Sequence, residues 1–511
     1  MNGAESLVRT LLASGVDTCF ANPGTSEMHF VAALDRIPGM RCVLGLFEGV
    51  ATGAADGYAR MAGKPAATLL HCGPGLANGL ANLHNARRAS SPVVNCVGDQ
   101  ATQHRPLDAP LTADTEGWAR GASAWVRTAR RASEVGADAA VAVQAARTSP
   151  GQVATLILPS DTCWDEGGEV AAPLPVPVAP QVAPFAVETA RRLLLCGEPT
   201  LLLVGGKALS AAGLADASRI AAATGARLLA PLSNARVARG RGRHPIERVP
   251  YPVDAAMRAL AGVRHLILVG ATAPVTFFAY PGKPGRPYPA DAEVHVLARP
   301  EQDAVAALAA LAAALDAPAL APPAPDRATP ARGAVSPEAF ARSLAALLPE
   351  QAVVVDESVS FGRGLFAGTH AAAPHDWLNL CGGAIGEGLP MATGAAIGAP
   401  GRRVVTLQAD GSALYTVQAL WTQARERLDV TTILLDNRCY AILQHELVAV
   451  GANPGRTALD MLDLGNPDMD WVRIAEGFGV AAARAETMER FNDLFAQSCV
   501  RPGPFLIALA T

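Results

Sequence analysis

The chain contains 511 residues, of which half are hydrophobic, and carries a formal net charge of −4. Its length favours about three domains rather than a single core. The balance of 42 basic and 46 acidic residues, without a long run of one sign, argues against nucleic acid or an anionic membrane as a partner.

Two further features bear on the compartment. No uninterrupted apolar run approaches the roughly 20 residues of a membrane span, and residues 1–5 lack the basic segment of a signal peptide. The nine cysteines are scattered, odd in number and never spaced Cys-x-x-Cys, which indicates reduced thiols and argues against a zinc site. We therefore expect a cytoplasmic protein.

Two proline-rich passages, residues 171–185 and 317–335, are typical of extended linkers. They divide the chain into blocks at 1–170, 186–316 and 336–511. Each block alternates short Val, Leu and Ile runs with Ala-rich helical stretches, the pattern of parallel α/β layers. We expect three doubly wound parallel-sheet domains of the α/β class.

The first block places two candidate site residues after predicted strands. Its elements are expected to be a helix over residues 5–13, strands over 18–20, 42–44 and 67–70, and a helix over 50–61. Glu48 precedes the second helix, whose small residues predict a close approach to another backbone; an isolated Glu there would ordinarily complement the helix dipole. His71 follows the last strand and enters a Gly-Pro-Gly loop, although such a loop alone predicts only a turn and a lone His after a strand is more often a capping residue.

The middle block contains two runs, 201–206 and 265–270, in which a strand ends in glycine. Neither continues as G-x-G-x-x-G with an acidic residue about 20 positions on, so the dinucleotide signal is weak. We expect a structural Rossmann-like domain without FAD.

In the third block, a strand over 404–407 leads to Asp410-Gly411-Ser412 and a helical pattern through Trp421, and a second strand over 430–435 ends in Asp436-Asn437. Asp410 and Asn437 should thus lie at the carboxyl ends of adjacent parallel strands, where open sheets bind ligands. Their oxygens suit Mg²⁺, and the helix after Asp410 would favour a diphosphate. The alternative is a pair of ordinary turns.

Together these stretches resemble the thiamine diphosphate (ThDP) enzymes, across all three blocks. Residues 48–60 (EGVATGAADGYAR) are similar to the family's Glu and its helix ending Ala-Asp-Gly-Tyr-Ala-Arg, and residues 71–79 (HCGPGLANG) to its Gly-Pro-Gly loop with a following Asn. The metal motif differs at the first glycine and first asparagine, which spares its metal-binding side chains. The Asn-Pro-Gly turn at 22–24 and the Leu-His pair at 70–71 resemble the benzoylformate decarboxylase branch most, although many such chains are labelled acetolactate synthase-like.

This resemblance implies roles for individual residues. Glu48 would hydrogen-bond the pyrimidine, His71 would act as general acid, and Thr25 would position the substrate carboxylate. Asp410, Asn437 and the carbonyl of Cys439 would bind Mg²⁺. The resemblance assigns the remaining cofactor contacts to Gly73, Asn78, Ser360, Gly383, Ile385, Gly411, Ser412 and Tyr440. Without its flanking glycines, Ile385 could equally be a plain core residue.

The resemblance further implies that a 2-oxo acid loses CO₂ and that the enamine is protonated or joined to a second carbonyl. An acetolactate synthase-type carboligase acting on pyruvate and a cofactor-binding but inactive scaffold stay open as alternatives. The branch places a second His in the middle block, but residues 273–280 contain none, which puts proton delivery of that kind in question; His445 could replace it or lie on the surface. Because the family's Glu and metal anchor come from different subunits, a homodimer is the expected minimum and a homotetramer the expected assembly.

Overall fold

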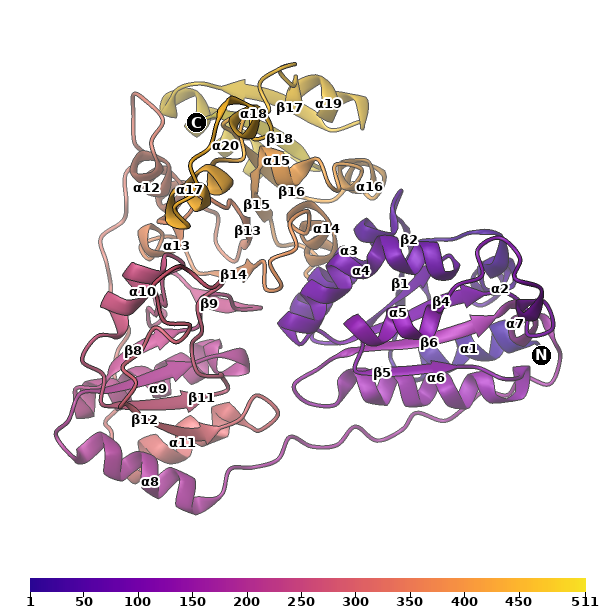
Figure 1. The fold of residues 1–511 in the computed structure, drawn as a ribbon, viewed down its shortest axis with the longest axis horizontal. Coiled ribbons are helices and arrows are strands. Elements are labelled where there is room, and N and C mark those ends of the chain that lie inside the picture. Colours follow the sequence, from indigo (N-terminus) through magenta and orange to yellow (C-terminus); the bar gives the residue numbers. More distant parts are fainter.

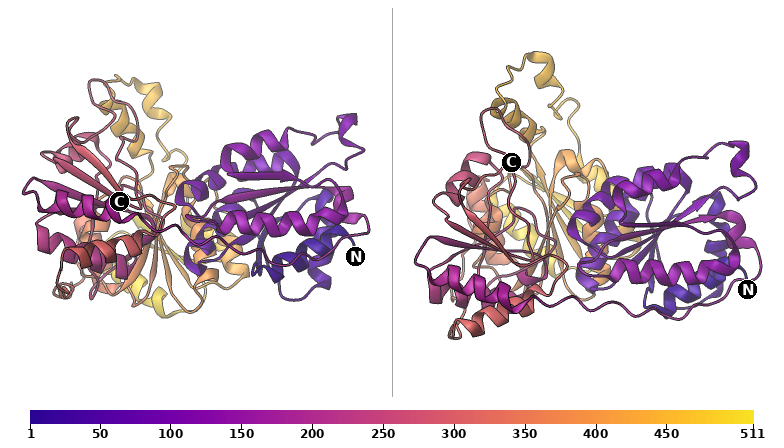
Figure 2. Two further views of the ribbon diagram at one scale, coloured as in Figure 1. Left: turned by 90° about the horizontal axis from the view of Figure 1, so that it is seen from below. Right: turned by 60° about the horizontal axis from the view of Figure 1, so that its bottom comes forward.

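Three separate sheets organise the chain, one in each of three α/β domains (Figure 1). The computed structural model describes residues 1–511. The first domain lies against the third, and the second domain lies on the third domain's other side (Figures 1 and 2). This confirms the predicted fold class.

The first sheet has the order β2-β1-β3-β4-β6-β5, and all of its pairs are parallel. Its strands are β1 (Thr18–Asn22), β2 (Arg41–Leu44), β3 (Ala66–Leu70), β4 (Val93–Asp99), β5 (Trp125–Thr128) and β6 (Val153–Pro159). The helices are α1 (Gly3–Ala13), α2 (Met28–Arg36), α3 (Glu48–Ala62), α4 (Cys72–Ala89), α5 (Thr115–Ala122), α6 (Ala132–Arg147) and α7 (Ser160–Trp164). The central strands are buried on both faces, as continuous apolar runs predict for a doubly wound sheet.

The second sheet has the order β10-β8-β7-β11-β12. Its strands are β7 (Thr200–Val204), β8 (Arg227–Ala230), β10 (Glu247–Arg248), β11 (His265–Val269) and β12 (Glu293–Ala298), with helices α8 (Pro184–Leu195), α9 (Ala211–Thr224), α10 (Val253–Leu260) and α11 (Ala304–Ala314). The glycines that end β7 and β11 face each other, since a Cβ on Gly205 would lie 2.9 Å from the Gly270 carbonyl oxygen. These glycines therefore serve close backbone packing.

The third sheet has the order β17-β18-β16-β15-β13-β14-β9. Its strands are β13 (Val353–Glu357), β14 (His375–Asn379), β15 (Val404–Ala409), β16 (Val430–Asp436), β17 (Ala481–Ala485) and β18 (Phe505–Ala510), joined by β9 (Val237–Arg239). The helices are α12 (Pro337–Leu347), α13 (Leu365–Gly368), α14 (Gly388–Gly398), α15 (Asp410–Ala413), α16 (Ala419–Arg425), α17 (Ala441–Ala449), α18 (Arg456–Asp460), α19 (Trp471–Gly477) and α20 (Met488–Val500).

Two features of the third sheet differ from the sequence-based expectation. Strand β9 comes from the middle of the chain and pairs antiparallel with β14 at the edge, where the Arg239 guanidinium stacks 3.5 Å from the Phe366 ring centroid. The helix predicted to open at Ser412 and continue through Trp421 is instead two helices, α15, which already begins at Asp410, and α16. Thr416 lies between these two helices, and its hydroxyl donates to the Gly386 carbonyl oxygen at 2.8 Å.

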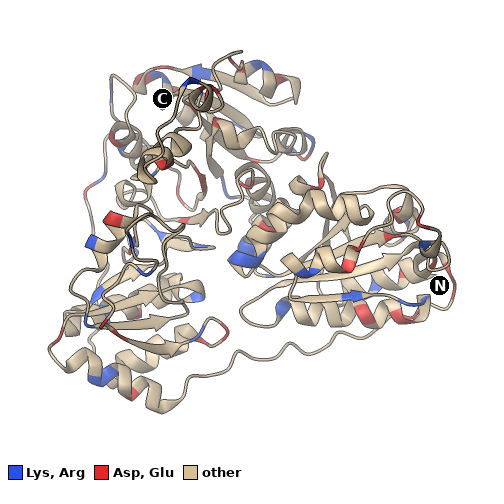
Figure 3. Cartoon of the chain, in the orientation of Figure 1, with Lys and Arg blue, Asp and Glu red and all other residues tan.

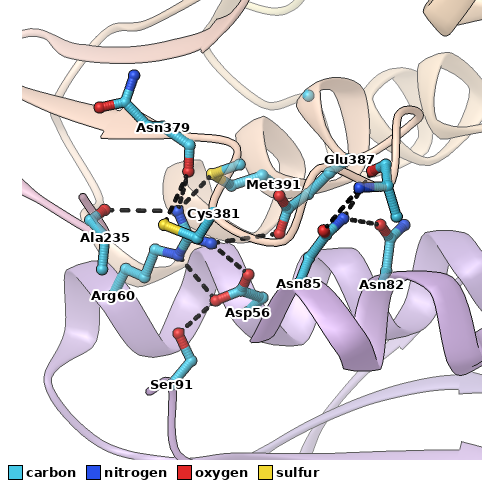
Figure 4. Close-up of polar contacts among 12 residues, drawn as sticks. Asp56, Arg60, Asn82, Asn85, Ser91, Ala235, Asn379, Cys381, Glu387 and Met391 are labelled. Carbon is cyan, nitrogen blue, oxygen red and sulfur yellow. Dashed lines mark hydrogen bonds and ion pairs between the residues drawn. The ribbon is translucent and has the colours of Figure 1, made fainter. Parts of the chain in front are cut away.

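Helices α3 and α14 join the first and third domains with their backbones almost touching. A Cβ on Gly57 of α3 would overlap the Met391 backbone of α14, which confirms the close approach to another backbone predicted from the small residues of α3. The buried Arg60 guanidinium crosses this interface and pairs with Asp56 at 2.6 Å and Glu387 at 3.3 Å (Figure 4). Burial, with Asp56 nearby, raises the pKa of Glu387 well above its usual value. The positive charge of Arg60 is therefore balanced mainly by the Asp56 carboxylate, and Glu387 does not add a second full negative charge.

The distribution of charged residues and the two proline-rich passages agree with what the sequence indicates. Charged residues of both signs are scattered over all three domains (Figure 3). Residues 171–183 and 319–332 form neither helix nor strand. None of the helices combines the length and apolar character needed to cross a bilayer.

Candidate active site

Two side chains of the first domain meet over Gly75. Glu48 begins α3, and His71 stands immediately before α4 at the end of β3. A Cβ on Gly75 would lie 3.0 Å from Glu48 Oε1 and 3.2 Å from His71 Cβ. The Asn78 amide donates to Glu48 Oε2 at 3.0 Å, and Glu48 is only 8% exposed. The structure thus brings Glu48, His71 and Asn78 together, and glycine is the residue that leaves both functional side chains in place.

The Gly-Pro-Gly segment is the first turn of α4 rather than a loop. Helix α4 begins at Cys72. Pro74 fits its first turn, because the backbone N–H that proline lacks would have no partner within the helix there. Gly73 packs against its own chain, since a Cβ there would lie 2.5 Å from the Ala113 side chain. Because the turn is helical, Asn78 lies one turn beyond Pro74 and on the side of Glu48.

A buried carboxylate that the sequence reasoning missed, Glu27, holds His71. Glu27 Oε2 lies 3.0 Å from His71 Nδ1 and accepts the Gly24 backbone N–H at 2.8 Å, and the Ser26 hydroxyl donates to the same carboxylate. A carboxylate at Nδ1 favours a proton on that nitrogen, which leaves Nε2 free to exchange a proton. Glycine is required at position 98 of β4, because Glu27 occupies the space of a side chain there.

Thr25 and His71 line the same cavity. It has a volume of about 300 Å³, at the lower end of the range for small-molecule pockets. Its lining combines polar and apolar side chains, contributed by Thr25, Ser26, Met28, His29, His71, Cys72, Gln100, Leu111, Ser160 and Trp164. The predicted substrate-positioning residue and the predicted general acid therefore face one space.

In the third domain, Asp410 and the segment after β16 meet as the sequence predicted. Strands β15 and β16 pair in parallel with Ala409 opposite Leu435, so both end at the same edge of the sheet. Asp410 Oδ1 accepts the Gly411 N–H at 2.7 Å, and Oδ2 accepts the Arg438 N–H at 2.6 Å.

The surroundings of Asp410 fit a cation. The residue is 1% exposed, its oxygens accept backbone N–H groups, and burial raises the pKa of its carboxyl to about 6. A metal ion would supply the missing positive charge. The Asn437 side-chain oxygen accepts the Cys439 N–H at 3.1 Å, and Asn437 directly precedes Arg438, whose backbone N–H binds Asp410. A carboxylate, an amide oxygen and a backbone carbonyl form a hard oxygen set suited to Mg²⁺.

The other predicted anchor residues surround this edge. A Cβ on Gly411 would lie 2.5 Å from the Tyr440 ring. The Tyr440 ring can therefore pack against α15 only because residue 411 is glycine. The Ser412 hydroxyl accepts from the Gln408 amide at 2.6 Å and donates to the Ala409 carbonyl. Ser360 is partly exposed in the turn after β13, the strand next to β15.

The loop with Gly383 and Ile385 is fastened by α4 of the same chain. The Asn85 amide donates to the Ala384 carbonyl at 2.7 Å, and its oxygen accepts the Ala384 N–H at 3.2 Å. Gly383 has a φ of +79°, which favours glycine. Ile385 is only partly buried, so it is not a fully buried core residue.

The middle segment without a histidine brings aromatic residues to this loop, and sequence reasoning did not single them out. A Cβ on Gly383 would lie 2.8 Å from the Phe277 ring, which is 5.4 Å from the Tyr251 ring. The Tyr251 hydroxyl donates to Glu446 of α17 at 3.0 Å, and burial together with this carboxylate raises the pKa of Tyr251. His445 is exposed on the same helix, as expected for a surface residue.

Comparisons with known proteins give consistent results. Residues 1–118 match the family model described as "Thiamine pyrophosphate enzyme, N-terminal TPP binding domain", and residues 364–509 match "Thiamine pyrophosphate enzyme, C-terminal TPP binding domain".

Individual relatives match over nearly the whole chain. The chain is 53% identical over 510 residues to a Mycobacterium tuberculosis protein named "Putative acetolactate synthase large subunit IlvX", covering 99% of this chain and 98% of that one. It is 30% identical to benzoylformate decarboxylase of Pseudomonas aeruginosa, with 97% and 96% covered. Among solved structures, the ThDP-dependent 4-hydroxybenzoylformate decarboxylase of Rhodococcus jostii RHA1 superposes with a TM-score of 0.85 at 25% identity, over 100% and 99% of the two chains.

Proposed function

The chain belongs to the thiamine pyrophosphate-dependent enzyme family, and from this premise we propose that it is a Mg²⁺-dependent decarboxylase of a 2-oxo acid. Its product would be an aldehyde after protonation or a 2-hydroxyketone after attack on a second carbonyl. The observation that carries the proposal is the meeting of Glu48 and His71 over Gly75, with His71 lining the cavity.

The cofactor residues follow from the two halves of the site. When bound, ThDP supplies the nucleophilic carbon and the electron sink for breaking the bond next to the carbonyl. Asp410, Asn437 and the Cys439 carbonyl would hold its Mg²⁺. Its diphosphate would lie near Ser360, Gly411, Ser412 and Tyr440, and its rings near Gly73, Asn78, Gly383 and Ile385.

Glu48 is suited to hold a proton for the pyrimidine ring. Asn78 binds Glu48 Oε2, whereas Oε1 faces Gly75, 3.0 Å from where a Cβ on that residue would lie. Because Glu48 is almost fully buried, a hydrogen bond from this carboxyl would be worth more than the same bond in water. Glu48 would therefore hold and return the proton at Oε1.

His71 and Thr25 would act on the substrate. The Thr25 hydroxyl, on the same cavity wall, would donate to the substrate carboxylate and orient it for loss of CO₂. Glu27 keeps the His71 ring in place through Nδ1, so Nε2 would deliver the proton that completes aldehyde formation. Glu27 would act as a positioning residue rather than a catalytic one.

We propose a homodimer as the smallest active unit, with Glu48 of one chain and Asp410 of its partner on one cofactor, and a homotetramer as the assembly. Nine free thiols support a reducing, cytoplasmic compartment. Acetolactate synthase-type carboligation of pyruvate is the second candidate, and the name of the Mycobacterium tuberculosis relative favours it.

Product analysis tests the proposal. The protein loaded with ThDP and Mg²⁺ would be incubated separately with benzoylformate and with pyruvate, and CO₂, aldehyde and hydroxyketone would be followed, with Glu48→Gln as the matched inactive control. Aldehyde from benzoylformate supports the decarboxylase, whereas acetolactate from pyruvate supports the second candidate. If a broad panel of 2-oxo acids yields no product above the control, the chain is a cofactor-binding scaffold and the proposal is wrong.

A further inference from the structure

Four side chains that the proposed reaction does not use gather at the amino edge of the second sheet, and we call them the His265 cluster: Cys196, Glu198, His265 and Glu293. Cys196 follows α8, and Glu198 lies in the turn before β7. His265 and Glu293 are the first residues of β11 and β12. This edge is opposite the carboxyl ends of the strands, where α/β sheets bind their usual ligands.

The distances within the cluster match a shared ion. His265 Nε2 lies 2.9 Å from Glu198 Oε2, and Nδ1 lies 3.3 Å from Glu293 Oε2. The Cys196 sulfur, a Glu198 oxygen and a His265 nitrogen all lie within 4.8 Å of one another. The His265 side chain is 10% exposed, while Cys196 is open to solvent. A cation can therefore reach a preformed group of three different ligand atoms.

Both nitrogens of the His265 imidazole lie near carboxylates, but the buried Nδ1 makes no hydrogen bond. An imidazole nitrogen without a proton has a lone pair that can bind a cation. The adjacent Cys196 sulfur favours the metal, because a thiol contributes nothing to a simple His–Glu pair but is a strong metal ligand once deprotonated.

We propose that Cys196, Glu198 and His265 bind a Zn²⁺-like divalent cation, with Glu293 orienting His265 from outside. Thiolate, carboxylate and imidazole are the ligands of zinc, and three protein ligands leave a fourth position for water. Histidines that bind a metal through one nitrogen usually donate the other N–H to a carboxylate, which is where Glu293 lies. Mg²⁺ is disfavoured because it prefers oxygen ligands.

The backbone around the cluster is arranged for such binding. Gly197 between the two first ligands has a φ of +82°, and Pro199 follows Glu198 and accepts the His265 backbone N–H at 3.2 Å. The Cys196 thiol donates to the Leu193 carbonyl at 3.0 Å. Metal binding would release this proton to solvent as the Cys196 thiolate forms its bond to the ion. The bound ion would fasten the end of α8 to the start of β11.

Cobalt titration of the reduced protein, loaded with ThDP and Mg²⁺, tests the site. We expect one Co²⁺ per chain at this site, a thiolate-to-cobalt absorption band, and loss of that band when Zn²⁺ is added. Cys196→Ser should remove the band and weaken Zn²⁺ binding at least tenfold, and His265→Gln should weaken it similarly. Cys42→Ser is the matched control, because Cys42 is the other exposed cysteine. His370→Gln is a second control, since His370 pairs with Glu247 without a cysteine.

The outcomes separate the alternatives. Co²⁺ that only replaces Mg²⁺ at Asp410 would give no thiolate band, because the ligands there are oxygens. A thiolate band that persists in Cys196→Ser, or Zn²⁺ affinity equal in wild type and Cys196→Ser, would overturn the proposal. Zn²⁺ should also raise the thermal midpoint of wild type but not of Cys196→Ser, which is a readout independent of enzymatic activity.

Discussion

Mixing two inactive variants should restore activity if each site is shared between chains. Glu48 belongs to the first sheet and Asp410 to the third, so Glu48→Gln and Asp410→Ala damage opposite ends of the proposed site. When the two variants are co-expressed equally, a site receives an intact Glu48 from one chain with probability one half, and an intact Asp410 from the partner with the same probability. About one quarter of all sites would then be intact, in a dimer or in a tetramer made of two dimers.

The assay is decarboxylation per chain, measured with the substrate identified in the product analysis. The matched control is the Glu48→Gln/Asp410→Ala double variant co-expressed with wild type. A shared site again predicts about one quarter of wild-type activity, whereas a site within one chain predicts about one half. No recovery above the single variants, together with one half in the control, would refute the shared site.

Four further outcomes are expected. Glu48→Gln should retain ThDP but reduce turnover by orders of magnitude, and near-normal turnover would remove Glu48 from the mechanism. Asp410→Ala should abolish Mg²⁺-dependent ThDP retention in equilibrium dialysis. Glu27→Gln should lower kcat by about 10- to 100-fold, because about 1.5–3 kcal/mol is lost with a charge-assisted hydrogen bond, whereas Glu426→Gln, which removes a partner of Arg41 outside the cavity, should not. Burial raises the pKa of Glu357 to about 7, so the native state binds more protons than the unfolded state between about pH 4.5 and 7. Stability should thus fall as pH rises through this window, by about 3 kcal/mol from this group, and less steeply in Glu357→Gln, as measured by urea unfolding at several pH values.

The sequence predicts those parts of the fold and site that depend on neighbouring residues. The three parallel-sheet domains follow from the alternation of apolar runs and helical stretches. The meeting of Asp410 with the segment after β16 follows because consecutive parallel strands end at one edge. The close packing of α3 follows from its small residues.

Features that depend on distant contacts could not be predicted in this way. Glu27 acquires its place only when β3 and β4 bring His71 and Gly98 to it. Strand β9 has three residues and forms only by pairing with β14. The His265 cluster joins residues 67 positions apart, so a search for paired cysteines passes over it.

Glycines show why one sequence signal can have two structural outcomes. In the second domain, a glycine after each of two strands lets the backbones of β7 and β11 approach each other, and Gly205 faces Gly270 rather than a ligand. In the first and third domains, glycines in the first helical turn after a strand border side chains instead. Gly75 makes room for Glu48 and His71, and Gly411 makes room for Tyr440. A glycine after a parallel strand therefore indicates close approach, but the nature of the approaching group depends on the fold. An alanine at position 75 should displace both Glu48 and His71, because its Cβ would lie close to both side chains. The two proposed proton-transfer groups therefore depend on the same glycine.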